Sequence, residues 1–398
     1  MDGYRVGPET ERMLELGHPW IIADRYTKGW TKGASGDLVL LQNQAGKPLA
    51  TALLDPGDRI IARVLARGQV KLSAHWFEEK FLAAKALREH AQLTETDVYR
   101  LVNGEGDGLP GLTVDRYGDY LMLQLYTGAW DRYRELITSA LVKVFTPRGI
   151  YRKLRPQETR ALEAKANSKK YSSLCWGAAA PVPLIVQEHG ISYLVDLSEG
   201  LNTGIFPDQR RNRLELMPRV VGKRVLNLFA FTGAFSVAAA AAGAAAVTSV
   251  DVSAKYLGIA EDNFKLNKLA SGRHRFIVAD VFAELAKMQA SGTRFDVILF
   301  DPPSFSTTRK SRFSTQGGTA KLVAATLPLL EPGGLLVSSS NHQKVSIEDY
   351  LKELRRGALQ SHDELRTIFV GGQPEDFPCP VTFPEGRYLK FVINVKGL

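Results

Sequence analysis

The sequence Val225-Leu226-Asn227-Leu228-Phe229-Ala230-Phe231-Thr232-Gly233 runs from a short apolar segment into a turn with one glycine. An alanine-rich segment follows, so the pattern is that of a buried strand leading into a helix. Four more apolar runs follow, with room for a helix before each of them: 246–251, 276–280, 296–301 and 334–339. Strands joined by crossover helices predict an α/β fold with a parallel, doubly wound, Rossmann-like sheet, which binds its ligand at the carboxyl ends of the strands.

Acidic residues at these strand ends predict a nucleoside site. Gly233 lets the backbone approach a ligand, and we expect Thr232 to cap the helix that follows. Asp251 ends the second strand, where a carboxylate can accept hydrogen bonds from both ribose hydroxyls, and Asp280 after the third can accept one from an adenine amino group. The dinucleotide pattern GxGxxG is not met, which disfavours NAD and a nicotinamide oxidoreductase. An acidic rim suits S-adenosylmethionine (SAM), because its sulfonium is cationic and it has no phosphate.

The fourth strand ends in Asp301-Pro302-Pro303-Ser304-Phe305. Two prolines stiffen this loop, and Asp301 with the proline carbonyls can accept hydrogen bonds from an amino group of a base. Phe305 could stack on a base extruded from its helix. Taken alone the loop would be a rigid turn, but its place at a strand end favours a catalytic role for Asp301, Pro302, Pro303 and Phe305. Arg309, Lys310 and Arg312 follow as candidate phosphate contacts.

Positive charge predicts a polyanionic partner. The 398 residues carry 51 Lys and Arg against 42 Asp and Glu, a net charge of +9. A cationic stripe in residues 148–170 consists of Arg148, Arg152, Lys153, Arg155, Arg160, Lys165, Lys169 and Lys170. Arg152, Lys153 and Arg155 are our candidates for RNA contact, although a solvated surface would explain the stripe equally well.

Composition and the positions of Gly and Pro turns predict three soluble domains. Short strands with Gly and Pro turns in residues 1–70 indicate a small β-barrel, 71–189 an α+β central domain, and 190–398 the doubly wound domain. No membrane span or secretory leader is evident, so the cytoplasm is expected. Two cysteines, Cys175 and Cys379, cannot build a four-cysteine zinc site, and no metal is expected. A homodimer is a further expectation.

Several motifs in fixed order resemble one known family across nearly the whole chain. They are His18-Pro19-Trp20, the segment from Glu105 to Arg116, the segment Leu201 to Arg210, Asn227 to Gly233, Asp251, Asp280, Asp301 to Phe305, and Phe383 to Lys390. The chain resembles class I SAM-dependent methyltransferases of bacterial large-subunit (23S) ribosomal RNA that carry an N-terminal PUA domain. The resemblance implies that Gln209, Arg210, Phe231, Val252 and Val281 border the cofactor together with Gly233, Asp251 and Asp280.

One departure from the family concerns the methylated atom. Members that make 5-methylcytosine carry a cysteine after the fifth strand, where this chain has Asn341, as in the loop of guanine-N7 enzymes. Cytosine C5 needs a thiolate at C6 before it can attack, whereas a nitrogen can attack the methyl group directly. Two chemistries therefore stay open: nitrogen methylation with Asn341 at the site, or C5 methylation with Cys379 as the thiol. A catalytically inactive RNA-binding or ribosome-assembly factor is the non-enzymatic alternative.

Overall fold

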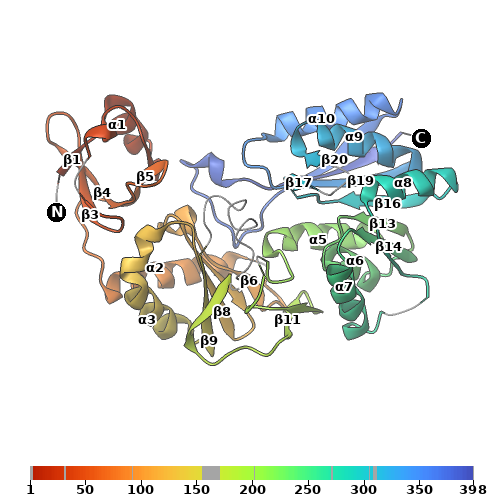
Figure 1. Ribbon diagram of the computed structural model, residues 1–398, viewed down its shortest axis with the longest axis horizontal. Helices are drawn as coiled ribbons and strands as arrows, with labels where there is room; N and C mark the ends of the chain where they lie inside the picture. Colours follow the sequence, from red (N-terminus) through yellow and green to blue (C-terminus); the bar gives the residue numbers. More distant parts are fainter. Residues whose placement is uncertain are drawn as a thin grey trace.

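The structure is a computed structural model that describes residues 3–30, 33–91, 93–154, 171–200, 202–269, 272–303, 305–307 and 312–397, without the side chains of 154, 305–307 and 312–317. Three larger sheets follow one another along the chain, each with its own helices (Figure 1). This arrangement confirms the predicted mixed α/β class. In the described part of the chain no helix is long and apolar enough to cross a membrane.

The first sheet is formed by the N-terminal strands. Its order is β1 (Gly3–Arg5), β3 (Leu38–Gln42), β4 (Pro48–Leu54), β5 (Ile60–Arg67) and β2 (Trp20–Ile22). Only β1 and β3 are parallel; the other neighbours are antiparallel. Helix α1 (Pro8–Glu15) packs Leu14 into a core with Val6, Ile21 and Leu41. Short, mostly antiparallel strands agree with the closely spaced strands and turns expected in this region.

The second sheet is covered by two helices on one face. Its order is β10 (Ser172–Gly177), β9 (Gly149–Leu154), β8 (Tyr120–Leu125), β7 (Leu112–Tyr117) and β6 (Val98–Asn103), and its helices are α2 (Ala74–Leu87) and α3 (Arg134–Phe145). Phe77 and Phe81 of α2 pack beside Trp130 in the core below the sheet. The hydroxyl of Ser73 accepts from Trp76 N and caps α2, as a serine before an apolar helix often does.

A two-stranded hairpin links the second sheet to the third. It consists of β11 (Leu184–Glu188) and β12 (Ile191–Val195). On one side Gln187 N donates to Asp97 at 2.6 Å, and on the other Leu194 N donates to Asn263 at 2.8 Å. The hairpin therefore contacts both neighbouring parts of the chain.

The third sheet has seven strands and places the candidate site. Its order is β15 (Arg275–Val278), β14 (Ala246–Asp251), β13 (Arg224–Leu228), β16 (Phe295–Phe300), β19 (Leu330–Ser340), β21 (Lys390–Lys396) and β20 (Leu365–Gly371). The first five are parallel, and β21 is antiparallel to both neighbours. The chain leaves β13 toward β14 on one side and returns to β16 on the other, and such a switch point opens a crevice at the carboxyl ends.

Helices cover both faces of this sheet (Figure 1). One face carries α5 (Arg210–Leu216), α6 (Ala234–Ala241) and α7 (Ala254–Leu266); the other carries α8 (Val281–Ala290), α9 (Thr315–Thr326) and α10 (Ile347–Gln360). Val225 and Val297 point into the first layer, while Leu226 and Ile298 point into the second. Burial on both faces explains why these strands read as continuous apolar runs.

Short elements complete the fold. The 3-10 turns are η1 (Thr27–Gly29), η2 (Arg88–His90), η3 (Gly104–Asp107), η4 (Gly128–Tyr133), η5 (Pro207–Gln209), η6 (Met217–Arg219), η7 (Leu327–Leu329) and η8 (Pro384–Gly386). A small hairpin of β17 (Phe305–Thr307) and β18 (Arg312–Ser314) follows the candidate catalytic loop.

Candidate functional site

Asp251 joins the turn after β13 to the end of β14. Its Oδ2 accepts from Phe231 N at 2.9 Å and its Oδ1 accepts from Ser253 N at 2.9 Å. Each carboxylate oxygen has two lone pairs, so both can accept a further hydrogen bond. This geometry suits a carboxylate that must point two acceptors at vicinal hydroxyls.

An apolar surface lies beside this carboxylate. The ring of Phe231 lies 5.4 Å from that of Phe206 and 4.4 Å from that of Tyr256, between ring centroids. Val252 is 54% exposed and offers its methyl groups to solvent. Val281, by contrast, is buried in the core between the sheet and α8, so only its backbone is available to a ligand. Phe206 and Tyr256 were not singled out from the sequence, although Phe206 stands in the segment Leu201 to Arg210.

The turn at Gly233 is shaped by the chain's own packing. Gly233 has a φ of +75°, and a Cβ there would lie 2.7 Å from the Cβ of Ala260 in α7. Glycine is therefore required for contact between α6 and α7 whether or not a ligand is near. The expected cap by Thr232 is wrong, because Gly233 is the N-cap residue of α6 and the Thr232 hydroxyl donates to Gly204 O.

Asp280 stands at the end of β15 and starts α8. Its Oδ1 accepts from Ala283 N at 3.1 Å, so it is the N-cap of that helix. The cap holds the carboxylate at the carboxyl edge of the sheet. Asp251 and Asp280 therefore sit at adjacent strand ends, as the sequence predicted, since β14 and β15 are paired neighbours.

Gln209 links three elements around Asp301. Its Nε2 donates to Asp301 Oδ2 at 2.9 Å and to Ser339 Oγ at 2.8 Å, and its Oε1 accepts from Asn212 at 2.6 Å. Asp301 follows β16 and Ser339 lies in β19, so the amide of η5 bridges two strand ends. Burial and the nearby Asp208 carboxylate raise the pKa of Asp301 to about 6. Asp301 is thus ionised at neutral pH and held in one orientation.

The neighbours of Gln209 contact the C-terminal segment. Tyr388 OH donates to Asp208 Oδ2 at 2.7 Å, and burial raises the pKa of both groups. Arg210 is 1% exposed, and its Nη2 lies 2.8 Å from Oδ1 of Asp376. The other carboxylate oxygen of Asp376, Oδ2, accepts from Arg100 N. The guanidinium of Arg210 is therefore engaged with the loop before β21, and not with the strand end that Gln209 reaches.

The two prolines after Asp301 differ in exposure. Pro302 is buried and Pro303 is exposed. Phe305 begins β17, and its side chain lies outside the described part of the structure. Its proposed stacking role therefore stays a prediction.

Lys390 supports the chain around Asn341. Asn341 directly follows β19 and is exposed. The ammonium of Lys390, in β21, donates to His342 O at 2.6 Å and to Tyr388 O at 2.7 Å, and burial lowers the pKa of Lys390 to about 8. The sequence places Lys390 at the end of the segment Phe383 to Lys390, but no local pattern indicates that its side chain contacts the chain after β19.

Cys379 packs near the N-terminal sheet. Its thiol donates to Phe383 O at 2.8 Å, and burial raises its pKa. The ring of Phe383 lies 4.6 Å from that of Trp20 in β2, between centroids. The thiol is thus neutral and engaged with its own loop, whereas a catalytic nucleophile needs a lowered pKa.

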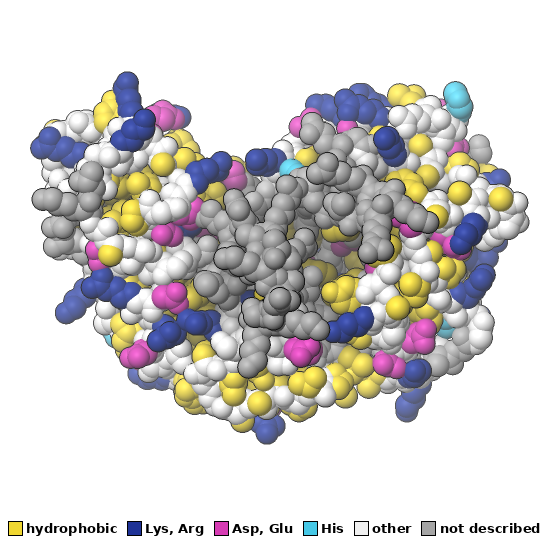
Figure 2. Space-filling model, in the orientation of Figure 1, with side chains coloured by type: hydrophobic (Ala, Val, Ile, Leu, Met, Phe, Trp, Pro, Cys, Tyr) yellow, Lys and Arg dark blue, Asp and Glu magenta, His cyan; other side chains and the backbone are white. Residues whose placement is uncertain are grey.

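The candidate RNA contacts fall into different environments. Arg152 is partly exposed and its Nη1 donates to Asp131 at 2.8 Å. Lys153 is 2% exposed and donates to Gly200 O at 3.0 Å, which argues against RNA contact by this side chain. Arg155, Arg309 and Lys310 lie outside the described residues, and of Arg312 only the backbone, in β18, is described. Figure 2 shows Lys and Arg side chains on both rims of the notch between the part with the first sheet and the part with the third sheet.

Comparison with known proteins connects this geometry to a family. The sequence model of the family of S-adenosylmethionine-dependent methyltransferases matches residues 128–379, and the family model of a PUA-like domain matches residues 5–67. The chain is 34% identical over 382 residues to ribosomal RNA large subunit methyltransferase I of Klebsiella pneumoniae (strain 342), covering 96% of this chain and 94% of that protein. It is 33% identical to the protein of the same name from Escherichia coli O157:H7, with 96% of each chain covered.

Solved structures agree over the full length. SMU.776, named as a methyltransferase and crystallised with SAH, has a TM-score of 0.89 at 31% identity and covers 99% of this chain and 100% of its own. A SAM-dependent methyltransferase structure from Streptococcus mutans has a TM-score of 0.86 at 30% identity, with the same coverage. With the acceptors of Asp251 and Asp280 set beside exposed apolar side chains at the carboxyl edge of its sheet, this chain belongs to the S-adenosylmethionine-dependent methyltransferases and carries an N-terminal PUA-like domain.

Proposed function

We propose that this chain methylates a base of large-subunit (23S) ribosomal RNA. The observation that carries the proposal is the bridge from Gln209 to Asp301, which holds an ionised acceptor at the strand end beside the cofactor residues. The relatives at 33–34% identity over 96% of the chain are named ribosomal RNA large subunit methyltransferases, which supports the same substrate class here.

The residues around Asp251 fit SAM. The two carboxylate oxygens keep capacity for the ribose hydroxyls after accepting from Phe231 N and Ser253 N. Phe231 and Val252 offer apolar contact to an adenine ring, and Asp280 an acceptor to its amino group. When bound, SAM supplies a methyl group on a cationic sulfonium, which an acidic strand edge favours electrostatically.

Asp301 and Pro302 would position the acceptor base. The Asp301 carboxylate and the Pro302 carbonyl can accept hydrogen bonds from an amino group of the base. The carbonyl of Pro303 is the third acceptor in this rigid loop. Gln209 and Ser339 fix the carboxylate, so the base is oriented without reorganisation of the loop. Asn341, on the chain held by Lys390, would meet the base from the neighbouring strand end.

The surroundings of the two candidate groups favour transfer to nitrogen. Asn341 occupies the position of the cysteine found in cytosine-C5 enzymes, and the Cys379 thiol is neutral and hydrogen-bonded to Phe383 O. A positioned nitrogen lone pair can displace the methyl group directly, with no covalent bond between enzyme and RNA. We therefore propose nitrogen methylation over cytosine C5.

Mass spectrometry of nucleosides tests both the substrate and the atom. Ribosomal RNA from a strain lacking this chain is compared with that of the parent, and the purified protein is then supplied with labelled SAM and the undermethylated RNA. We expect loss of one methylguanosine in the deletion strain and its restoration in vitro. Loss of 5-methylcytosine would sink the nitrogen assignment, while unchanged rRNA and no transfer would support the inactive RNA-binding alternative.

The three predicted domains would share the work of RNA recognition. We propose that residues 1–70 and 71–189 bind the RNA and that residues 190–398 carry out the methyl transfer. We also propose that the protein acts in the cytoplasm and can form a homodimer. Trp20 of the first sheet donates to Glu105 of the central region at 2.8 Å, which supports a fixed orientation of these two parts.

Neutralising Arg152, Arg155, Arg160 and Lys165 should flatten the salt dependence of RNA affinity. An unaltered slope would make this segment an ordinary solvated surface.

A further inference from the structure

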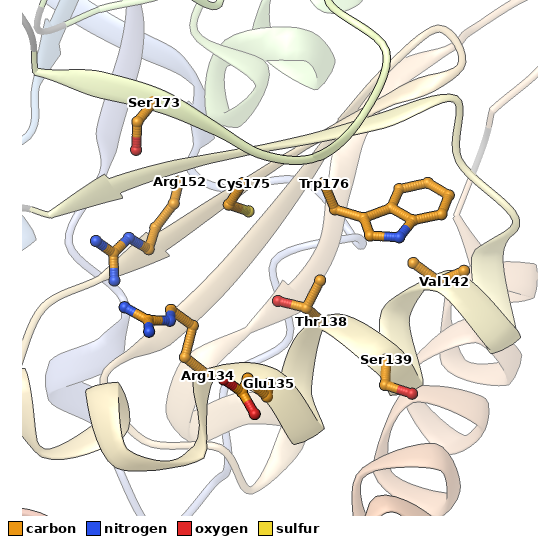
Figure 3. A pocket seen from close by; sticks show the side chains of 9 residues that line it. All are labelled: Arg134, Glu135, Thr138, Ser139, Val142, Arg152, Ser173, Cys175 and Trp176. Carbon is orange, nitrogen blue, oxygen red and sulfur yellow. The ribbon is translucent and has the colours of Figure 1, made fainter.

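A groove opens on the central region, and its lining residues come from the second sheet and its helix α3 (Figure 3). It has a volume of about 600 Å³ and lies between helix α3 and strands β9 and β10. Thr138 and Ser139 of α3 form one wall, and Cys175 and Trp176 of β10 form the other. Of the residues that line the groove, only Arg152 has been given a role above, as a candidate RNA contact.

A β-bulge turns Trp176 into this groove. Leu174 pairs with Tyr151 and Trp176 pairs with Ile150, so Cys175 is the additional residue in β10. Because of the bulge, the consecutive residues Cys175 and Trp176 both line the groove, whereas Leu174 does not. The Trp176 side chain is 39% exposed, an unusual state for an indole on a sheet edge. The backbone irregularity thus presents an aromatic face to solvent.

Positive charge gathers at the other end of the groove. Figure 3 shows the guanidinium groups of Arg134 and Arg152 lying close together, with Cys175 between them and the indole of Trp176. Arg152 is bonded to Asp131, whereas Arg134 is exposed and makes no ion pair among the described residues. Glu135 also lines the groove and Asp131 pairs with Arg152, so two carboxylates stand against the two guanidinium groups. Arg134 is the guanidinium that remains available to an anion.

We propose that this groove binds one unpaired nucleotide of the RNA, with its base stacked on Trp176 and its phosphate between Arg134 and Arg152. A nucleotide combines an aromatic face with a negative charge, and the groove has an indole at one end and guanidinium groups at the other. Hydroxyls of Thr138 and Ser139 line the space between the two ends and can bond to ribose or base edges. The inference rests on the proposed RNA substrate but concerns a site separate from methyl transfer.

Replacement of Trp176 tests the groove in the full-length protein. Trp176→Ala should raise the KM for undermethylated 23S rRNA by about fivefold to 100-fold, because base–aromatic stacking is lost, and should leave kcat unchanged. Trp176→Phe should restore most of the affinity. Leu174→Ala is the matched control, since Leu174 is 41% exposed on the same strand but outside the groove. Arg134→Gln should make the plot of log affinity against log salt concentration less steep, by the amount expected for the loss of about one phosphate contact.

Two measurements keep this inference apart from the proposed function. SAM affinity by calorimetry should be equal in wild type and Trp176→Ala, which confirms that the variant is folded. Fluorescence anisotropy of a labelled single-stranded oligoribonucleotide reports RNA binding even if no rRNA is methylated. Equal oligonucleotide affinities for wild type and Trp176→Ala would overturn the groove. So would a loss of dimers in sedimentation caused by Trp176→Ala, since that result would assign the indole to a second copy of the chain.

Discussion

Gln209 donates to Asp301 through a hydrogen bond of 2.9 Å that joins the η5 turn to the end of strand β16. The same amide nitrogen reaches Ser339 of β19 at 2.8 Å, so one side chain sets the spacing of two strand ends. Hydrogen bonds to the carboxylate oppose the rise in the pKa of Asp301 that burial causes. Gln209 therefore controls both the orientation and the charge of the proposed base-binding acceptor.

Loss of this amide should impair turnover and shift the pH dependence. Gln209→Ala removes a hydrogen bond that favours the ionised form, so the pKa of Asp301 should rise above that of the wild type. We expect kcat for methyl transfer to fall at least tenfold at pH 7, with a smaller deficit at pH 8.5. Gln289→Ala, which alters a surface amide that donates to Ala325 O, is the control and should behave as wild type. A uniform loss at every pH would contradict the electrostatic role.

The wild-type pH profile should report Asp301 directly. The carboxylate accepts hydrogen bonds from the base only when ionised, and its pKa is raised to about 6. We expect kcat/KM for RNA to rise with pH, with an apparent pKa near 6. A single-turnover profile with saturating SAM checks this expectation. Activity that is independent of pH across this range would remove Asp301 from base recognition.

Asp301 should also reduce stability at neutral pH. Its pKa in the folded state, about 6, lies above the ordinary value of 3.8, so the folded state holds the proton more tightly and stability falls as pH rises between these values. Asp301→Asn should therefore raise the free energy of unfolding at pH 8 by about 1–3 kcal/mol, about half as much at pH 5, and almost nothing at pH 3, where Asp301 is protonated in both states. Asp262→Asn, on exposed Asp262, serves as the control. A destabilised Asp301→Asn at pH 8 would show that the charge is compensated.

Asp251 should dominate cofactor affinity. A charge-assisted hydrogen bond contributes about 1.5–3 kcal/mol, so Asp251→Ala should weaken SAM binding at least tenfold in a calorimetric titration. Asp262→Ala is the matched control in the neighbouring helix α7 and should leave affinity unchanged. Equal affinity for wild type and Asp251→Ala, or a preference for NAD, would remove Asp251 from the cofactor site.

Cys379 should be dispensable for chemistry. Its thiol is neutral and bonded to Phe383 O, so Cys379→Ala and Cys379→Ser should keep methyl transfer within about threefold of wild type. The Ala variant should lose about 1–2 kcal/mol of stability, because the side chain is half-buried. Inactivity of both variants with normal SAM affinity would instead identify Cys379 as the nucleophile of a cytosine-C5 enzyme.

The alternation of strands and helices and the acidic strand ends followed from the sequence alone. Apolar runs separated by helical segments are local patterns, and parallel strands necessarily bring their carboxyl ends to one edge. Gly233, Asp251, Asp280 and Asp301 could therefore be placed together without any knowledge of side-chain contacts. The cofactor followed from Gly233, Asp251 and Asp280, since acceptors without a phosphate cradle suit SAM, whereas the enzyme class rested on the resemblance of several motifs to a known family.

Tertiary structure alone decided which polar groups meet. Gln209 and Asp301 are 92 residues apart, and Asp208 and Tyr388 are 180 apart, so no local pattern could pair them. Thr232 has the side chain of a helix cap, but a distant carbonyl accepts its hydroxyl hydrogen instead. Arg152 and Lys153 look alike as charges in the sequence, yet successive side chains of a strand point to opposite faces, and only one of the two faces solvent. Local sequence determines periodicity and turn chemistry, whereas contacts between distant segments depend on how the finished elements pack.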